Sequence, residues 1–275
     1  MIGHHFLGNA MSSTLDRPVV AALAVVDIDR NRLQARIDLA AAHRLAVMHG
    51  FHEGIFNHLT LRVPGTNDRY YQIPFGLHWS EVTASCFMEV GYDGKLKAGS
   101  GEIEQSCYCI HAPIHELSAQ SAAVFHTHMP FATALSRLED QSILPIGQTE
   151  LGTRMTTCYD DHYDGPAFDP AEGRRLAGLL GGHTIMMMAN HGALTVGATV
   201  AEAYDRLYYL ERVAQVQLYA MWTNRPLRHL PQATVDKTYA EYRQSGVKYG
   251  GRSNADWHFA ALKRILDKKE PDYRD

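Results

Sequence analysis

Two histidine motifs in the sequence have the spacing of metal ligands. One is Phe125-His126-Thr127-His128 and the other is Asn190-His191-Gly192, and each directly follows a short apolar stretch. Side chains two residues apart on an extended backbone point to the same face, so His126 and His128 can converge on one ion. Strand ends are also where α/β sheets place ligand sites. Three neutral imidazoles with an open position suit a catalytic divalent metal such as Zn, Fe(II), Mn or Co.

Short strands and helices alternate irregularly around these motifs. Apolar runs bounded by turn residues predict strands over residues 59–63, 70–73, 87–90, 122–126, 184–188 and 193–196. Apolar spacing and capping residues predict helices over residues 31–49, 107–117, 131–138, 171–180, 199–222, 237–242 and 256–266. The polar stretch over residues 147–170 is expected to be a loop. This order predicts a three-layer α/β domain with a mixed or antiparallel central sheet.

The domain is expected to span residues 29–225, with an arm over residues 1–28 and a helical tail over residues 226–275 that packs on it. The first residues lack the basic and apolar segments of a signal peptide, and Met11 is an alternative start to Met1. The 26 basic and 30 acidic residues give a net charge of −4, which offers no footprint for nucleic acid. No apolar run approaches the roughly 20 residues that span a bilayer. With only four cysteines, we expect a cytoplasmic protein.

Further blocks, in their order and spacing, resemble the class II aldolase/adducin superfamily. They comprise residues 56–62 (FNHLTLR), 73–77 (IPFGL), 81–85 (EVTAS) and 197–217, placed around the two histidine motifs. The resemblance covers roughly residues 33–225. It implies a three-layer α/β/α sandwich with a largely antiparallel sheet, and a homotetramer or similar homo-oligomer with sites at subunit contacts. It also implies that His126, His128 and His191 bind one divalent metal ion per subunit.

The sequence departs from the phosphosugar aldolases of this superfamily at a glutamate that serves them as metal ligand and acid/base. Counting back from the first histidine motif places Cys107 there, while Glu104 lies one helical turn earlier and Glu116 much later. A buried apolar cysteine is the favoured interpretation of Cys107. The alternative is a thiolate ligand or acid/base at a helix N-terminus. His111, one turn further on, could also supply acid/base chemistry.

The residues that would bind substrate also differ from those of the aldolases. Where the aldolases use hydroxyl and glycine residues for phosphate, an aromatic ring at Phe75 would deprive a phosphate of a hydrogen bond. We therefore expect a small, non-phosphorylated substrate, bound by residues that include an asparagine matching the family. The substrate-binding candidates are Asn57, Phe75, Gly76, Trp79, Gln105 and Ser106. Tyr159 and Tyr163 are candidate proton donors in the region that borders the active site in relatives.

Three functions remain open on this sequence. The first is a metal-dependent lyase that cleaves or forms a C–C bond next to a carbonyl, by aldol or decarboxylation chemistry. The second is a mononuclear non-haem Fe(II) oxygenase that oxidatively decarboxylates an aromatic 2-oxo or 2-hydroxy acid, as one branch of this superfamily does. The third is a non-catalytic, adducin-like interaction module. It ranks last because the chain keeps all three histidines, which adducin heads lose.

Overall fold

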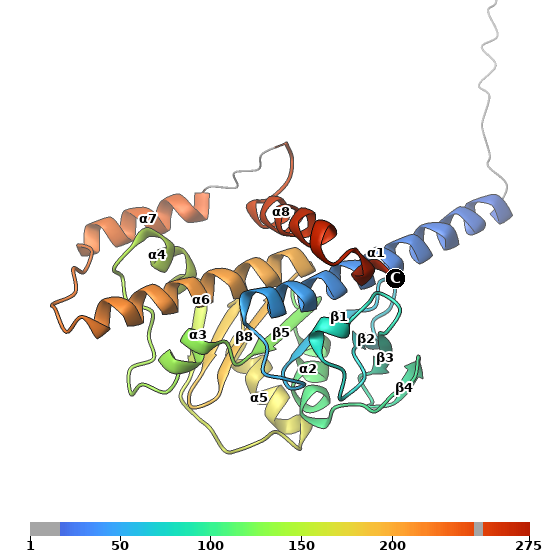
Figure 1. The fold of residues 1–275 in the computed structure, drawn as a ribbon, viewed down its shortest axis with the longest axis horizontal. Coiled ribbons are helices and arrows are strands. Elements are labelled where there is room, and N and C mark those ends of the chain that lie inside the picture. The colour runs from blue at the N-terminus through green and yellow to red at the C-terminus, as the bar shows by residue number, and fades with distance from the viewer. Residues whose placement is uncertain (1–16, 245–249) are drawn as a thin grey trace, which may run out of the picture.

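An eight-stranded sheet forms the centre of the protein (Figure 1). The structure is a computed structural model that describes residues 17–244 and 250–275. The strands are β1 His58–Arg62, β2 Arg69–Gln72, β3 Met88–Gly91, β4 Leu96–Ala98, β5 Ala123–Thr127, β6 Thr157–Asp160, β7 Ile185–Met188 and β8 Gly192–Gly197. In the order β4-β3-β2-β1-β5-β8-β7-β6, neighbours are antiparallel except β6 and β7. The predicted α/β class with a largely antiparallel sheet is confirmed.

Helices cover both faces of this sheet, which gives the expected three layers (Figure 1). The helices are α1 Arg17–His49, α2 Gln105–Leu117, α3 Pro130–Leu135, α4 Gln148–Arg154, α5 Pro170–Leu180, α6 Val200–Trp222, α7 Gln232–Gln244 and α8 Asn254–Lys269, with 3₁₀ turns η1 Trp79–Glu81 and η2 Pro271–Arg274. Alternate residues of β5 face opposite layers. Phe125 belongs to one core with Leu39 of α1, whereas Val124 belongs to another with Ile114 of α2 and Leu176 of α5.

The layer of α2 and α5 is close-packed at one glycine. A Cβ atom on Gly173 of α5 would overlap the carbonyl oxygen of Cys109 in α2. That carbonyl lies four residues before Pro113, which has no N–H to donate to it. Only glycine therefore lets α5 approach this part of α2, and α2 carries several of the side chains that face the histidine motifs.

The C-terminal segment packs on the other layer. Phe259 and Leu266 of α8, together with Tyr273 of η2, are buried in the same core as α1 and α6. Arg44 of α1 reinforces this contact with ion pairs to Glu270 at 3.1 Å and to Asp272 at 2.7 Å. Among the described residues, no helix combines the length and the hydropathy needed to cross a membrane.

Several element boundaries differ from those predicted. Helix α1 begins at Arg17, so residues 17–28 of the expected arm are helical, and residues 1–16 lie outside the described residues. The expected loop over residues 147–170 contains α4 and β6. Helix α4 has seven residues, too few to show a helical period, and β6 is an edge strand with polar residues at both ends. Strand β4, three exposed residues long, was also not predicted.

Candidate metal centre

The two histidine motifs meet at one end of the sheet. His126 is on β5, His128 follows that strand, and His191 lies in the turn between β7 and β8. Strand β8 pairs with β5 so that Thr127 lies opposite Ala193, which brings His191 beside the end of β5. One ring nitrogen from each histidine lies within 4.8 Å of the others, and the ring centroids are 4.7–5.0 Å apart. The structure therefore brings together the three predicted metal ligands.

Hydrogen bonds define which ring nitrogens are free. His126 Nδ1 lies 3.0 Å from the carbonyl oxygen of Ala193, which can only accept, so Nδ1 carries the proton. His128 Nδ1 contacts the carboxylate of Glu53. In the neutral rings both Nε2 atoms then present lone pairs to each other, 3.2 Å apart, and neither can donate. Two ligand nitrogens of a tetrahedral zinc ion are about 3.3 Å apart, so a divalent cation fits this donor set.

The surroundings of His126 and His191 keep these two rings neutral. Burial, followed by the neighbouring histidines His191 and His128, lowers the pKa of His126 well below its usual value. Burial and His128 likewise lower the pKa of His191 to about 4. Neutral imidazole is the form that binds metal, so the free nitrogens are available at neutral pH without the loss of a proton.

The backbone around the motifs also requires particular residues. A Cβ atom on Gly192 would lie 2.7 Å from both His128 Cδ2 and the carbonyl oxygen of Thr127, so a larger residue would displace the ligand. Asn57 has a φ of 74°, in the left-handed region that asparagine tolerates, and its Oδ1 accepts a hydrogen bond of 3.0 Å from the His128 amide. Asn57 thereby holds the backbone of the second ligand.

A cavity of about 500 Å³ opens beside the three histidines. The polar residues Glu104, His58 and Ser106 are among those that line it, together with five apolar residues. The apolar residues are Phe56, Ile110, Pro166, Ala167 and Phe168. No lysine or arginine is among the lining residues in the part of the chain that the structure describes. The cavity therefore suits a small, partly apolar ligand with a group that a metal can polarise.

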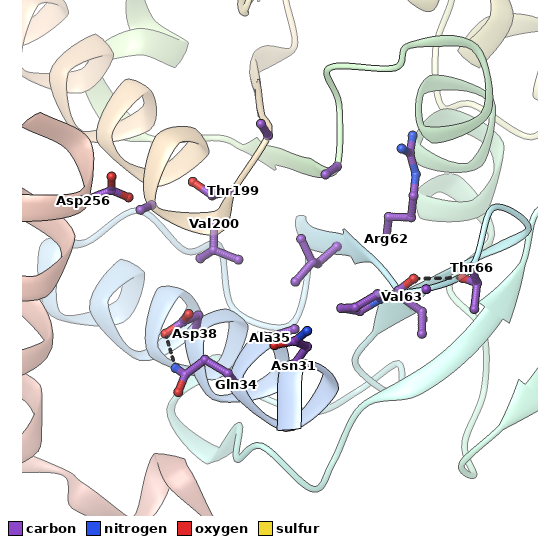
Figure 2. A pocket seen from close by; sticks show the side chains of 16 residues that line it. Asn31, Gln34, Ala35, Asp38, Arg62, Val63, Thr66, Thr199, Val200 and Asp256 are labelled. Carbon is purple, nitrogen blue, oxygen red and sulfur yellow. Dashed lines mark hydrogen bonds between the residues drawn. The ribbon is translucent and has the colours of Figure 1, made fainter. Parts of the chain in front are cut away.

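A second cavity, of about 450 Å³, has no lining residue in common with this one (Figure 2). It is formed by α1, the turn after β1 and the start of α6, with Asp38, Arg62 and Thr199 among its lining residues. No histidine or cysteine is among the described residues that line it. The cavity at the end of β5 is therefore the candidate active site.

Comparison with known proteins agrees with this arrangement. The family model for the class II aldolase and adducin N-terminal domain matches residues 37–218. The chain belongs to this family. It is 35% identical to a Pseudomonas aeruginosa protein named as an aldolase class 2 protein on a provisional basis, over 88% of this chain and 92% of that protein. It is also 28% identical to rat alpha-adducin, over 87% of this chain but only 34% of the adducin.

Solved structures of class II aldolase family members have the same fold. An aldolase II superfamily protein from Pseudomonas syringae superimposes with a TM-score of 0.81 at 33% identity, covering 89% of this chain and 96% of that one. An L-fuculose 1-phosphate aldolase from Glaciozyma antarctica superimposes with a TM-score of 0.76, covering 90% and 94%, at 23% identity. The latter likeness supports the fold alone.

Among the other predicted class II aldolase site residues, two line the main cavity beside Asn57. The ring of Tyr163 lies 5.7 Å from that of His191, and Ser106 donates a hydrogen bond of 2.8 Å to Glu104. Phe75 lies in a small adjoining cavity with Asn57 and Glu104, and its ring is 6.4 Å from Phe56. These placements are compatible with roles in binding substrate.

The remaining predicted substrate and proton-donor residues lie elsewhere. Trp79 is fully buried in the core, with its ring 5.1 Å from His43. The Tyr159 hydroxyl accepts a hydrogen bond of 3.0 Å from the Ile143 amide. Gln105 contacts the sulfur of Cys109, and Gly76 forms an exposed turn with a φ of 92°. None of these four lines the main cavity.

The carboxylate that the sequence analysis set aside does face the cavity. Glu104 is the N-cap of α2, where its side chain accepts hydrogen bonds from the amides of Ser106 and Cys107. It also pairs with His58 Nε2 at 2.7 Å. Burial opposes its charge, but His58 and these helix donors outweigh burial and hold the pKa of Glu104 at about 2. An acidic residue directly before a helix was the signal that could have found it.

Cys107, which the sequence predicts at the position of the aldolases' glutamate, is fully buried. Burial, followed by the charge of Glu104, raises the pKa of its thiol well above the usual value. In the metal-free protein it is therefore a protonated thiol. His111 is buried as well, and its pKa is lowered well below the usual value by burial and by His58 and His115.

Proposed function

We propose that this protein is a metal-dependent lyase that cleaves or forms a C–C bond next to a carbonyl of a small, non-phosphorylated substrate. One observation carries the proposal. The Nε2 atoms of His126 and His128 face each other at 3.2 Å, with His191 beside them, at the edge of a cavity of about 500 Å³. Three histidines with an open position are the ligand set of a catalytic rather than a structural metal.

His126, His128 and His191 would hold one divalent ion, Zn or Fe(II), with Mn or Co as alternatives. Such an ion supplies a Lewis acid that polarises a substrate carbonyl. Glu53 and the Ala193 carbonyl orient two of these rings through their Nδ1 atoms. The hydroxyl of Tyr163, next to His191, would donate or accept the proton that the cleaved bond requires.

The substrate class follows from the lining of the cavity. With Glu53 and Glu104 on its walls, a phosphate dianion would meet like charge that no lysine or arginine among the described lining residues offsets. Phe56 and Phe168 offer apolar surface instead. The family resemblance further leads us to propose a homo-oligomer, such as a homotetramer.

A non-haem Fe(II) oxygenase acting on an aromatic 2-oxo or 2-hydroxy acid is the second candidate. One observation favours it: the three-histidine group found among the described residues contains no carboxylate, in contrast to the glutamate-containing set of the aldolases. The aromatic residues of the cavity would suit such a substrate. Oxygen consumption separates this candidate from the lyase.

The test uses protein purified without oxygen, analysed for metal and assayed on a panel of small 2-oxo and 2-hydroxy acids. We expect about one metal ion at this site and substrate cleavage without oxygen uptake, both abolished by His126→Ala combined with His191→Ala. The exposed His229→Ala is the matched control. Substrate-dependent oxygen uptake with iron would replace the lyase by the oxygenase. A double variant that binds as much metal as the wild type would refute the metal centre, and a protein with neither metal nor turnover would favour the interaction module.

A further inference from the structure

A second group of potential ligands lies on the inner side of the cavity wall. His58 of β1 and Cys107 and His111 of α2 each offer one atom, and these atoms lie within 4.8 Å of one another. We call these three residues the inner cluster. The His58 ring stacks on that of His126 at 5.8 Å and meets the His111 ring edge-on at 5.3 Å. The inner cluster is therefore adjacent to the three cavity histidines but uses different residues.

The tautomer of His58 leaves one nitrogen facing inward. Its Nε2 is 2.7 Å from a carboxylate oxygen of Glu104, which accepts, so Nε2 carries the proton. In the neutral ring, Nδ1 is then a lone-pair nitrogen. It is buried and has no hydrogen-bond partner among the described residues.

A chain of hydrogen bonds determines the tautomer of His111 in the same way. His115 Nδ1 lies 2.9 Å from the carbonyl oxygen of Ser121, so it donates, and its Nε2 must accept. The Thr60 hydroxyl lies 2.8 Å from that Nε2 and donates to it, although the Val124 carbonyl at 3.2 Å is a longer alternative. The Thr60 oxygen can then accept from His111 Nδ1, at 2.7 Å. His111 Nε2 is left with a lone pair, buried and without a partner among the described residues.

The Cys107 thiol cannot donate a hydrogen bond to both His58 Nδ1 and His111 Nε2. A thiol has one proton to donate, so one buried nitrogen would stay unpaired, and such a group carries a desolvation cost of about 1–3 kcal/mol. A cation bound between them satisfies both nitrogens and the sulfur at once. Two imidazoles and a thiolate are ligands that zinc prefers, and Glu104 and Thr60 already hold the outer nitrogens of the two rings.

We propose that His58, Cys107 and His111 form a second metal site, specific for a thiophilic divalent ion such as Zn²⁺ and separate from the ion held by the cavity histidines. On binding, Cys107 Sγ forms a bond to the metal and releases its proton to solvent, with no change of oxidation state. The ion would fasten α2 to β1 and so set the positions of Glu104 and His58 in the cavity wall. This inference goes beyond the proposed function and does not depend on which bond the enzyme cleaves.

Cobalt loading of the purified full-length chain tests the second site. A thiolate bound to Co²⁺ gives a near-ultraviolet charge-transfer band, which histidine ligands alone do not give. We expect about two Co²⁺ ions per chain and this band in the wild type. In Cys107→Ser we expect about one Co²⁺ and no band. In His126→Ala we expect the band to remain, and Cys109→Ser, on the same helix, to keep it too.

Three outcomes would overturn the proposal. Wild-type protein with one Co²⁺ and no band would show that Cys107 stays a thiol, whatever the variants do. A band that disappears in His126→Ala would make Cys107 a ligand of the cavity ion. A band that persists in Cys107→Ser but is lost in Cys109→Ser would show that the metal-bound thiolate is Cys109. None of these outcomes depends on turnover, so the lyase proposal is judged separately.

Discussion

Two sets of histidines, one at the cavity and one in the core, differ in what surrounds the ring nitrogen that carries no proton. His126 and the partly buried His191 lie at the cavity, whereas His43 and His115 are buried in the packed layers, and all four have a lowered pKa. In each of His43, His115 and His126, Nδ1 donates a hydrogen bond to a backbone carbonyl oxygen. His43 Nε2 then has no described partner and its ring contacts Trp79, whereas His126 Nε2 faces two further imidazoles.

This comparison shows that burial and a shifted pKa do not by themselves identify a site. Desolvation lowers the pKa of a histidine wherever it is buried. What distinguishes the cavity histidines is convergence: several lone pairs point into the same space, where one cation can satisfy them together. A single buried imidazole such as His43 has no such partner set and is a packing residue.

The largest expected difference is in metal affinity. His191→Ala removes one of three ligands and should weaken divalent metal binding at the cavity by more than the ten- to hundredfold typical of losing an outer hydrogen-bond partner. His43→Leu should leave the affinity unchanged. Competition with a metal chelator measures both, in the Cys107→Ser background so that only the cavity ion is counted. An equal loss of metal affinity in the two variants would contradict the assignment of metal binding to the cavity histidines alone.

The next effect is on the free energy of unfolding at acid pH, and it concerns His43 of the core set. Burial lowers the pKa of His43 from 6.5 to about 4, so the unfolded chain binds a proton there between these values while the folded chain does not. This histidine therefore lowers the free energy of unfolding by about 3 kcal/mol as the pH falls from 6.5 to 4. His43→Leu should remove that contribution, which urea unfolding at several pH values would show. An unchanged pH profile would mean that His43 is protonated in the folded state.

The difference between the cavity histidines and the core histidines could be predicted only in part from the sequence. The convergence of the three cavity histidines is predictable because their geometry is local: His126 and His128 share one face of an extended segment, and His191 lies in the turn of the neighbouring hairpin. The outer partner Glu53 and the wall residue His58 come from a segment about 70 residues away from the ligands they contact. No spacing rule connects them to the motif before the fold is known.

Residue type alone did not predict which side chains line the cavity. Trp79 and Phe75 are both aromatic and close in sequence, yet one is fully buried in the core and the other is 45% exposed beside the cavity. Glu104 was set aside because counting back from the first histidine motif leads to Cys107 and ignores the residue that caps the helix, whose side chain folds back over the first turn. The class of fold was more secure, because alternating apolar strands and capped helices constrain it along the whole chain.

A glycine pair sharpens the comparison at the backbone. Gly192→Ala places a methyl group against His128 and the Thr127 carbonyl, so we expect a loss of about 1–3 kcal/mol in unfolding free energy and weaker metal binding. Gly178→Ala, in the exposed last turn of α5 with open space around it, should instead stabilise the protein by about 0.5–1 kcal/mol. Thermal unfolding with and without added metal compares them. A Gly192→Ala protein with unimpaired metal binding would show that His128 can move without cost.

The smallest expected effect on metal affinity separates charge from hydrogen bonding at Glu53. Its carboxylate contacts His128 Nδ1 and fixes the tautomer that leaves Nε2 free, an arrangement the core histidines lack, since they bond only to neutral groups. Glu53→Ala should reduce metal affinity by about a hundredfold and Glu53→Gln by about tenfold, because the amide oxygen still accepts the proton but carries no charge. Chelator competition, again in the Cys107→Ser background, measures both. If Glu53→Gln binds metal as weakly as Glu53→Ala, the charge matters and the hydrogen bond does not; if both bind like the wild type, the half-exposed Glu53 is a surface residue and the ring is oriented by its packing alone.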